Sequence, residues 1–269
     1  RRHAVPVSVA LLNGQPASAD DLRALALINY GHFTSMQVRD HAVQGIELHR
    51  QRLISETREL FGTTLDFAAV RAQMRAAVAD TPACSLRVTV FSRHFDYRSP
   101  AENHVPDVLV SVAPASPPRT YALRVKSFPF LRPLPHLKHV GTFPLFHHRR
   151  QAVLASFDDA LFADSEGFIS EGSIWNIGFW HQGRVVWPEA AALRGTAEQL
   201  LQAALAQQGV EQVIRPVNLA ELPQFESAFA CNAGAIQSIA AIDETVFSAS
   251  GACMDRLVVA AAVTPWEVL

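Results

Sequence analysis

The chain has 269 residues, of which 49% are hydrophobic and 18% charged, and its formal net charge is −2. This length and composition suit one large folded domain or two smaller ones and exclude an intrinsically disordered protein. The near-zero charge gives no reason to expect a nucleic acid or an anionic membrane as the main partner, and no apolar run reaches the roughly 18 residues of a membrane span.

The N-terminal residues and the cysteines add two expectations about the cellular compartment of the protein. Residues 1–14 have a short apolar run, which predicts a first strand and turn rather than a signal peptide. Cys84, Cys231 and Cys253 are widely spaced, which argues against a disulfide framework or a zinc site. They favour a reducing, cytoplasmic setting.

Helices and strands alternate along the N-terminal half. Apolar spacing and turn residues predict, in chain order, a helix over 17–29, a strand over 33–40, a helix over 46–62 ending at Gly62, a helix over 65–80 and strands over 85–92 and 107–113. The proline-rich stretch 114–119 is the best candidate for a linker.

The same alternation continues beyond the proline-rich stretch. The pattern predicts a strand over 121–128, a turn around Lys138, a helix over 145–156, strands over 159–164, 174–180 and 184–188, a helix over 195–209, strands over 211–217 and 227–233, and a helix over 253–263. We therefore expect an α/β or α+β fold with a small N-terminal domain (1–113), a linker (114–119) and a large C-terminal domain (120–269).

Lysine is rare in this chain. Only Lys126 and Lys138 occur, while arginine supplies every other cation. A lysine can lose its proton and an arginine cannot, so a lysine in the partly apolar turn 134–141 is a candidate for forming a Schiff base. Taken alone, Lys138 also fits a surface lysine whose amine stays in water.

Other candidate residues also have ordinary structural explanations. Glu171 lies in an acidic, glycine-containing turn and suits a general acid or the partner of a protonated ring nitrogen, or simply a solvated turn. Gly195 and Thr196 open a helix whose N–H groups suit a phosphate, although many helices begin this way and bind nothing. His49 and Arg52 share a helix face, where Arg52 suits a phosphate or a solvated basic surface.

The sequence lacks the motifs that are typical of several other kinds of site. The eleven histidines show no HxxxH or HExxH spacing, so no metal site is expected. Nucleotide loops of the GxGxxG or P-loop type and a GxSxG nucleophile turn do not occur either.

The order of the candidate residues is more specific than any one of them. The chain resembles the fold-type IV pyridoxal-phosphate enzymes, which include class IV aminotransferases and aminodeoxychorismate lyase. The likeness runs from about Leu12 to Pro265. It rests on an H-x-x-R-L helix at 49–53, on Lys138 before a helix, and on a D-G-x-[IV]-[ST]-E-G-type segment at 164–173 followed by Asn176.

The resemblance implies a two-domain fold, a homodimer and pyridoxal 5'-phosphate as cofactor. The C-terminal domain would be a pseudo-barrel that binds the cofactor. Lys138 would hold the cofactor as a Schiff base and move the substrate's α-proton, and Glu171 would pair with the pyridine nitrogen. The family's phosphate-binding positions correspond here to Arg52, Gly195, Thr196, Ala197, Asn232 and Ala233.

The substrate side departs from the family pattern. Phe33 occupies the position of a tyrosine in D-amino-acid transaminases. The segment 92–100 replaces an arginine-containing loop of the lyase, which leaves Arg93 and Arg98 as candidates to bind a substrate carboxylate.

Three functions follow from the resemblance. The first is amino transfer between an amino acid or amine and a 2-oxo acid. The alternative is a lyase that releases pyruvate to give 4-aminobenzoate, because 33–38 and 231–233 resemble that enzyme's stretches. The third is a cofactor-binding protein without turnover.

Overall fold

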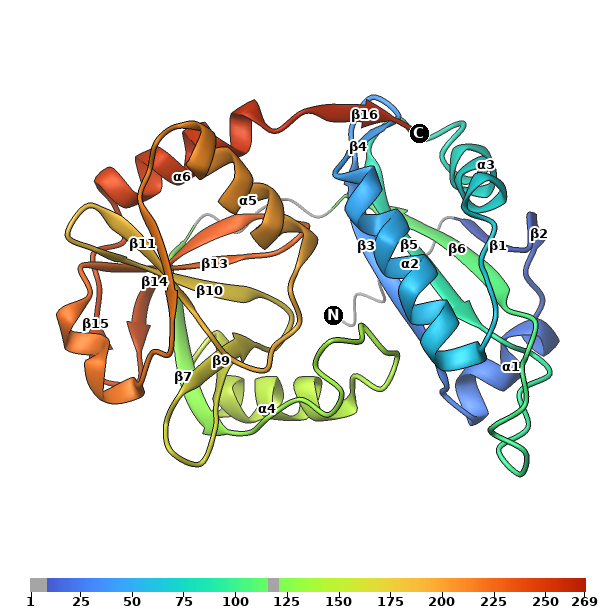
Figure 1. The fold of residues 1–269 in the computed structure, drawn as a ribbon, viewed down its shortest axis with the longest axis horizontal. Coiled ribbons are helices and arrows are strands. Elements are labelled where there is room, and N and C mark those ends of the chain that lie inside the picture. The colour runs from blue at the N-terminus through green and yellow to red at the C-terminus, as the bar shows by residue number, and fades with distance from the viewer. Residues whose placement is uncertain (1–8, 116–120) are drawn as a thin grey trace. The chain divides into compact units, whose positions relative to one another are not determined.

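The computed structural model of the protein describes residues 9–115 and 121–269. The chain divides into two compact units (Figure 1). The N-terminal unit contains the described residues up to 115 together with Leu137–Gly141 and Pro265–Leu269, and the C-terminal unit contains those from 121 to His136 and Thr142–Thr264. Of the expected linker 114–119, Pro114 ends a strand, and residues 116–119 lie outside the described residues.

The N-terminal unit is built on an antiparallel sheet of five strands. Their order is β2 (Gln15–Pro16), β1 (Val9–Leu12), β6 (Asp107–Pro114), β5 (Cys84–Phe91) and β3 (Gly31–Val38). Alternation in β5 turns Leu86 and Val88 into the core. Helices α2 (Ile46–Phe61) and α3 (Phe67–Ala77) supply the other side of that core through Leu53 and Met74. Helix α1 (Ala19–Leu27) packs against a second apolar cluster.

The segment that carries Lys138 belongs to the N-terminal unit. The backbone N–H of Phe33 donates to the carbonyl of Lys138 at 2.9 Å, and that of Val140 donates to Gly31 at 2.9 Å. Residues 137–141 therefore run along the edge strand β3, although the sequence predicts them in the C-terminal domain. Strand β16 (Trp266–Val268) also belongs to the N-terminal unit, although it comes from the end of the chain. It pairs with β4 (Ala42–Gln44).

The C-terminal unit is built on a sheet of nine strands that curls around an apolar interior (Figure 1). The strand order is β12 (Gln212–Arg215), β11 (Arg184–Pro188), β10 (Asn176–His181), β13 (Ser227–Cys231), β14 (Ile236–Ile242), β7 (Leu123–Pro129), β8 (Asp159–Ala163) and β9 (Ile169–Gly172), with β15 (Thr245–Val246) on β14. Leu161, Phe179 and Ile239 fill the interior.

Helices cover the outside of this sheet. Helices α5 (Thr196–Gln207) and α6 (Ala252–Val263) share a cluster with Trp187 and Phe229, and α4 (Phe143–Leu154) packs against Phe162. A short 3-10 helix spans Leu219–Gln224. None of the helices in the described part of the chain is long and apolar enough to span a bilayer.

The mixed α/β class is confirmed, and β9 and β14 are the two longest of the strands that the sequence pattern does not predict. Strand β9 lies where a turn is predicted, and β14 covers a stretch to which no element is assigned. Both contain serine, glycine or alanine, which have weak strand preference. Their pairing with β8 and β13 decides their conformation, and such pairing partners are not visible in a local pattern.

Two histidines are buried between β3 and α2. His32 is fully buried and its Nε2 lies 2.9 Å from the hydroxyl of Thr57, while the Nδ1 of His49 lies 2.6 Å from the hydroxyl of Thr34. Burial, followed by the charge of Arg52, lowers the pKa of both rings to about 3. Both histidines are therefore neutral in the folded protein at neutral pH.

These histidines predict a specific loss of stability in acid. The unfolded chain binds a proton at each ring near pH 6.5, whereas the folded chain does so only near pH 3. The free energy of unfolding therefore has its full value above about pH 6.5. It decreases below that pH, by about 2 kcal/mol per histidine at about pH 5. Urea unfolding at a series of pH values measures this slope.

Substituting His49 shows how much of this pH dependence of stability comes from its imidazole ring. His49→Gln removes one titrating group, so its stability should depend less steeply on pH over this range than that of the wild type. The exposed His94 provides the control, since His94→Gln should keep the wild-type slope. Equal slopes in His49→Gln and the wild type would contradict the assignment.

Candidate functional site

One face of α2 carries three polar side chains at helical spacing. His49, Arg52 and Glu56 stand at i, i+3 and i+7, and all three are turned into the unit rather than into solvent. The Nε of Arg52 lies 3.8 Å from Glu56 Oε1, with side chains only 9% and 5% exposed. The solvated basic face expected as the alternative belongs instead to Arg50, which pairs with Glu47.

Glu56 also fixes the position of Lys138. Its Oε2 accepts a hydrogen bond from the backbone N–H of Lys138 at 3.1 Å. The Nζ of Lys138 lies 4.9 Å from the centroid of the Phe33 ring, a distance at which an ammonium group is attracted to the ring face. Lys138 is thus held at the edge of β3 by its backbone, and its amine lies beside an aromatic ring.

A second cation shares the ring of Phe33. The guanidinium carbon of Arg87 lies 3.6 Å from the ring centroid, and Arg87 Nε donates to Thr89 Oγ1 at 3.1 Å. Burial lowers the pKa of Arg87. Arg87 is not among the residues predicted from the sequence, although one signal was present: it is the lone charged residue within strand β5, between Leu86 and Val88, which face the core.

The N-terminal unit therefore offers an environment for an anion. Arg52, Arg87 and Lys138 bring three cationic side chains to one region, and the nearby His32 and His49 are kept neutral. Glu56 offsets part of this positive charge. This charge balance fits a ligand that carries phosphate and carboxylate groups, as pyridoxal 5'-phosphate with a bound amino acid does.

Glu171 is a buried strand residue and not part of a solvated turn. It lies in β9 and is 4% exposed. Its Oε1 accepts from the backbone N–H of Leu193 at 3.4 Å, and its Oε2 lies 3.8 Å from Nη1 of Arg132, which is itself buried. A buried carboxylate held by a cation and a backbone amide has a fixed orientation, which is what a partner for a ring nitrogen requires.

The beginning of α5 lies in the same unit and is tied to Glu171 through Leu193. Asn176 Nδ2 donates to the carbonyl of Leu193 at 2.6 Å, while Glu171 accepts from its N–H. A Cβ at Gly195 would come within 2.3 Å of Asn176 Oδ1, so this close approach requires glycine. No side chain caps α5, which begins at the buried Thr196. Its first N–H groups suit a phosphate.

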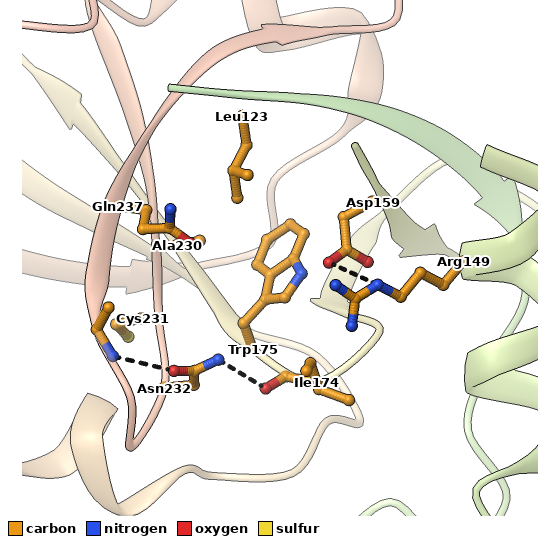
Figure 2. Close-up of a pocket in the computed structure, with 10 residues that line it drawn as sticks. Leu123, Arg149, Asp159, Ile174, Trp175, Ala230, Cys231, Asn232 and Gln237 are labelled. Carbon is orange, nitrogen blue, oxygen red and sulfur yellow. Dashed lines mark hydrogen bonds and ion pairs between the residues drawn. The ribbon is translucent and has the colours of Figure 1, made fainter. Parts of the chain in front are cut away.

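Asn232 shapes a turn after β13. Its Oδ1 accepts from the N–H groups of Gly234 and Ala235 at 2.8 and 3.2 Å. Its Nδ2 donates to the carbonyl of Ile174 at 3.4 Å, as Figure 2 shows. The side chain of Asn232 therefore holds the loop that contains Ala233.

The two arginines proposed from the sequence lie elsewhere in the N-terminal unit. Arg93 Nη1 donates to Asp21 at 2.6 Å, and Arg93 Nη2 donates to Asp107 at 3.0 Å, so two protein carboxylates already occupy this guanidinium. The guanidinium of Arg98 lies 4.7 Å from the ring centroid of its neighbour Tyr97. Arg87 instead stacks on Phe33, the ring that the amine of Lys138 also approaches.

Across residues 9–115 and 121–269, no group of three or more His, Cys, Asp or Glu side chains is arranged to hold a metal ion.

The fold is similar to those of solved aminotransferases and of a putative lyase. It is similar to a putative 4-amino-4-deoxychorismate lyase from Legionella pneumophila, with a TM-score of 0.79, 19% identity and coverage of 91% of this chain and 94% of that one. It is also similar to a branched-chain aminotransferase from the archaeon Thermoproteus uzoniensis solved with norvaline, with a TM-score of 0.82, 15% identity and coverage of 96% and 95%.

A third similar structure is the PLP-bound form of a hypothetical aminotransferase from Mycobacterium tuberculosis, with a TM-score of 0.79, 19% identity and coverage of 96% and 99%. No curated protein matches the sequence significantly. The family model described as amino-transferase class IV matches residues 31–242. Because this match spans most of the chain, the protein belongs to the class IV aminotransferases, a family of enzymes that depend on pyridoxal 5'-phosphate.

Proposed function

We propose that this enzyme moves an amino group between an amino acid or amine and a 2-oxo acid, with pyridoxal 5'-phosphate bound at Lys138. The observation that carries the proposal is the setting of this lysine. Its backbone is held by Glu56 and its amine lies beside Phe33. The other lysine of the chain, Lys126, lies within β7 with its amine near the rings of Phe128 and Phe157.

The cofactor, when bound, supplies an electron sink for the charge that develops when the substrate's α-proton leaves. We assign the covalent attachment and the transfer of that proton to Nζ of Lys138. Glu171 would accept a hydrogen bond from the protonated ring nitrogen, and Arg132 would keep Glu171 in position. Arg52 would bind the phosphate.

Backbone groups complete the proposed phosphate site. The N–H groups of Thr196 and Ala197 stand at the start of α5, where the helix dipole favours a negative charge. Gly195 permits the close packing of that start against Asn176. The turn of Asn232 and Ala233 is assigned to the same end of the cofactor.

Arg87 is our candidate to bind the substrate carboxylate. Its guanidinium is stacked on Phe33, the ring that Lys138 also approaches. A planar guanidinium binds a carboxylate through two parallel hydrogen bonds. We assign this role to Arg87 in place of Arg93, whose guanidinium pairs with Asp21 and Asp107, and of Arg98.

We also propose a homodimer in a reducing, cytoplasmic setting. The family resemblance suggests the dimer. Burial raises the pKa of Cys84, and all three cysteines are buried and free, as is usual for proteins in a reducing compartment.

A lyase that forms pyruvate and 4-aminobenzoate from aminodeoxychorismate is the second candidate. The stretches 33–38 and 231–233 favour it, because they resemble the corresponding stretches of that enzyme. The same assigned residues serve both reactions, so product analysis decides between them.

The first prediction concerns the reaction. Purified holoenzyme mixed with single amino acids and a panel of 2-oxo acids should form the 2-oxo acid of the donor and the amino acid of the acceptor, as measured by chromatography. Formation of pyruvate and 4-aminobenzoate from aminodeoxychorismate, with no exchange of amino groups, would establish the lyase instead. Cofactor binding without either product would contradict both enzymatic proposals.

The second prediction concerns Glu171. Glu171→Gln keeps the shape of the side chain but removes the negative charge opposite the ring nitrogen. We expect it to retain the cofactor and to lower kcat by about 100-fold or more. Glu166→Gln in the neighbouring exposed turn is the control and should keep wild-type kcat. A Glu171→Gln enzyme with wild-type kcat would refute the role.

The third prediction compares two arginines of α2. Arg52→Gln should weaken cofactor affinity by about 10- to 100-fold, because a charged hydrogen-bonding partner of the phosphate is lost. Arg50→Gln removes the same charge from the solvated side of the same helix and should leave affinity unchanged. Cofactor titration of the apoenzyme measures both. Equal losses of affinity in the two variants would show a general charge effect and not a phosphate contact.

A further inference from the structure

The C-terminal unit contains a pocket at one end of its curled sheet. Its volume is about 140 Å³. It is lined by residues of β7, β8, β13, β14 and α4, of the segment between β9 and β10, and of the loop between β13 and β14 (Figure 2). Neither Glu171 nor Thr196 lines it, and it shares only Asn232 with the proposed cofactor site.

Trp175 supplies a hydrogen-bond donor to this pocket. The residue is 5% exposed, and its Nε1 is buried without a hydrogen-bond partner among the described residues. The ring is fixed over Gly172, where a Cβ would come within 2.0 Å of it. An indole N–H can only donate, and a buried donor left without an acceptor costs about 1–3 kcal/mol. This cost is offset if an acceptor binds in the pocket.

Gln237 supplies a second donor of the same kind. Its Nε2 is also buried without a hydrogen-bond partner in the part of the chain that the structure describes. Gln237 lies on β14, and Trp175 precedes β10, so the two donors come from different segments. Two such donors in one pocket indicate a ligand with more than one acceptor atom.

The hydrogen-bond donors of the pocket, and not its net charge, favour an anion, because Arg149 and Asp159 are the charged residues of the lining and have opposite charges. Asp159 is already compensated: its Oδ1 accepts from Ser173 Oγ at 2.5 Å and from the N–H of Ala160 at 2.8 Å, and its Oδ2 lies 3.4 Å from Arg149 Nε. That contact uses the Nε side of Arg149 and leaves its terminal nitrogens available. Figure 2 shows the guanidinium of Arg149 and the indole of Trp175 directed toward one another across the pocket.

We propose that this pocket is a second ligand site that binds a compact carboxylate. The carboxylate would accept from the terminal N–H groups of Arg149 and from the N–H groups of Trp175 and Gln237. The volume corresponds to about four or five water molecules, which suits a ligand of a few heavy atoms. This proposal does not depend on the reaction assigned to the enzyme.

Fluorine NMR of the holoenzyme labelled with 5-fluorotryptophan tests the site. The chain has four tryptophans, and Trp175→Phe identifies the resonance of Trp175 by its disappearance. Titration with acetate or propionate should shift this resonance until it saturates and leave the other three nearly unchanged. Acetamide and propionamide have the same shapes without the charge and should bind at least about tenfold more weakly, because the ionic hydrogen bonds are lost.

Four further variants show where the carboxylate binds. Arg149→Lys keeps a cation beside Asp159 but removes the planar guanidinium with its paired N–H groups. Gln237→Leu removes one hydrogen-bond donor. Each should weaken acetate binding by about tenfold. Arg150→Lys, an exposed neighbour on α4, should bind acetate as the wild type does. Arg87→Lys alters the proposed substrate site and should also leave the acetate titration at Trp175 unchanged.

The proposal is wrong if no carboxylate gives a saturable shift at Trp175, if the amides bind as tightly as the acids, or if Arg149→Lys and Gln237→Leu both retain wild-type affinity. It is also wrong if Arg87→Lys abolishes the shift, because the carboxylate would then act from the substrate site. None of these results bears on amino transfer, which is measured by its products.

Discussion

The hydrogen bond from the backbone of Lys138 to Glu56 is the contact on which the proposed site depends. Residues 137–141 lie far along the chain from α2 and β3, yet they run along the edge of β3 and are fixed there by this carboxylate. Glu56 is buried and also contacts Arg52, so one side chain sets the position of a proposed covalent residue and of a proposed phosphate ligand. Helical spacing makes this possible, because Arg52 and Glu56 are one turn apart on α2.

The C-terminal unit uses a comparable arrangement around Leu193. Glu171 from β9 accepts from its N–H, and Asn176 from β10 donates to its carbonyl. The loop that leads into α5 is therefore held by two neighbouring strands, and Gly195 follows with the close approach to Asn176 that only glycine permits. The carboxylate that we propose for the ring nitrogen and the helix start that we propose for the phosphate thus belong to one hydrogen-bonded assembly.

Local patterns predicted the helices well, and the mixed α/β class with them. Helix α2 has apolar residues at helical spacing and ends before Gly62 as expected. Patterns failed where distant pairing decides the outcome: the serine and glycine of β9 have weak strand preference, and pairing with β8 makes Glu171 a buried strand residue. The order of Arg52, Lys138 and Glu171 indicated the family. Arg87 was missed although it is the lone charged residue of β5, because the local pattern does not show that it stacks on Phe33, which lies on another strand.

The scarcity of lysine makes one measurement decisive for the central claim, which is that Lys138 holds the cofactor. Borohydride reduction of the holoenzyme makes a lysine–cofactor linkage permanent, and peptide mass spectrometry then finds the modified residue. Only Lys126 and Lys138 are available. We predict the full cofactor mass on the peptide that contains Lys138, its loss in Lys138→Ala and its retention in Lys126→Ala. A modified Lys126, or a reduced protein with no modified lysine, would contradict the central claim.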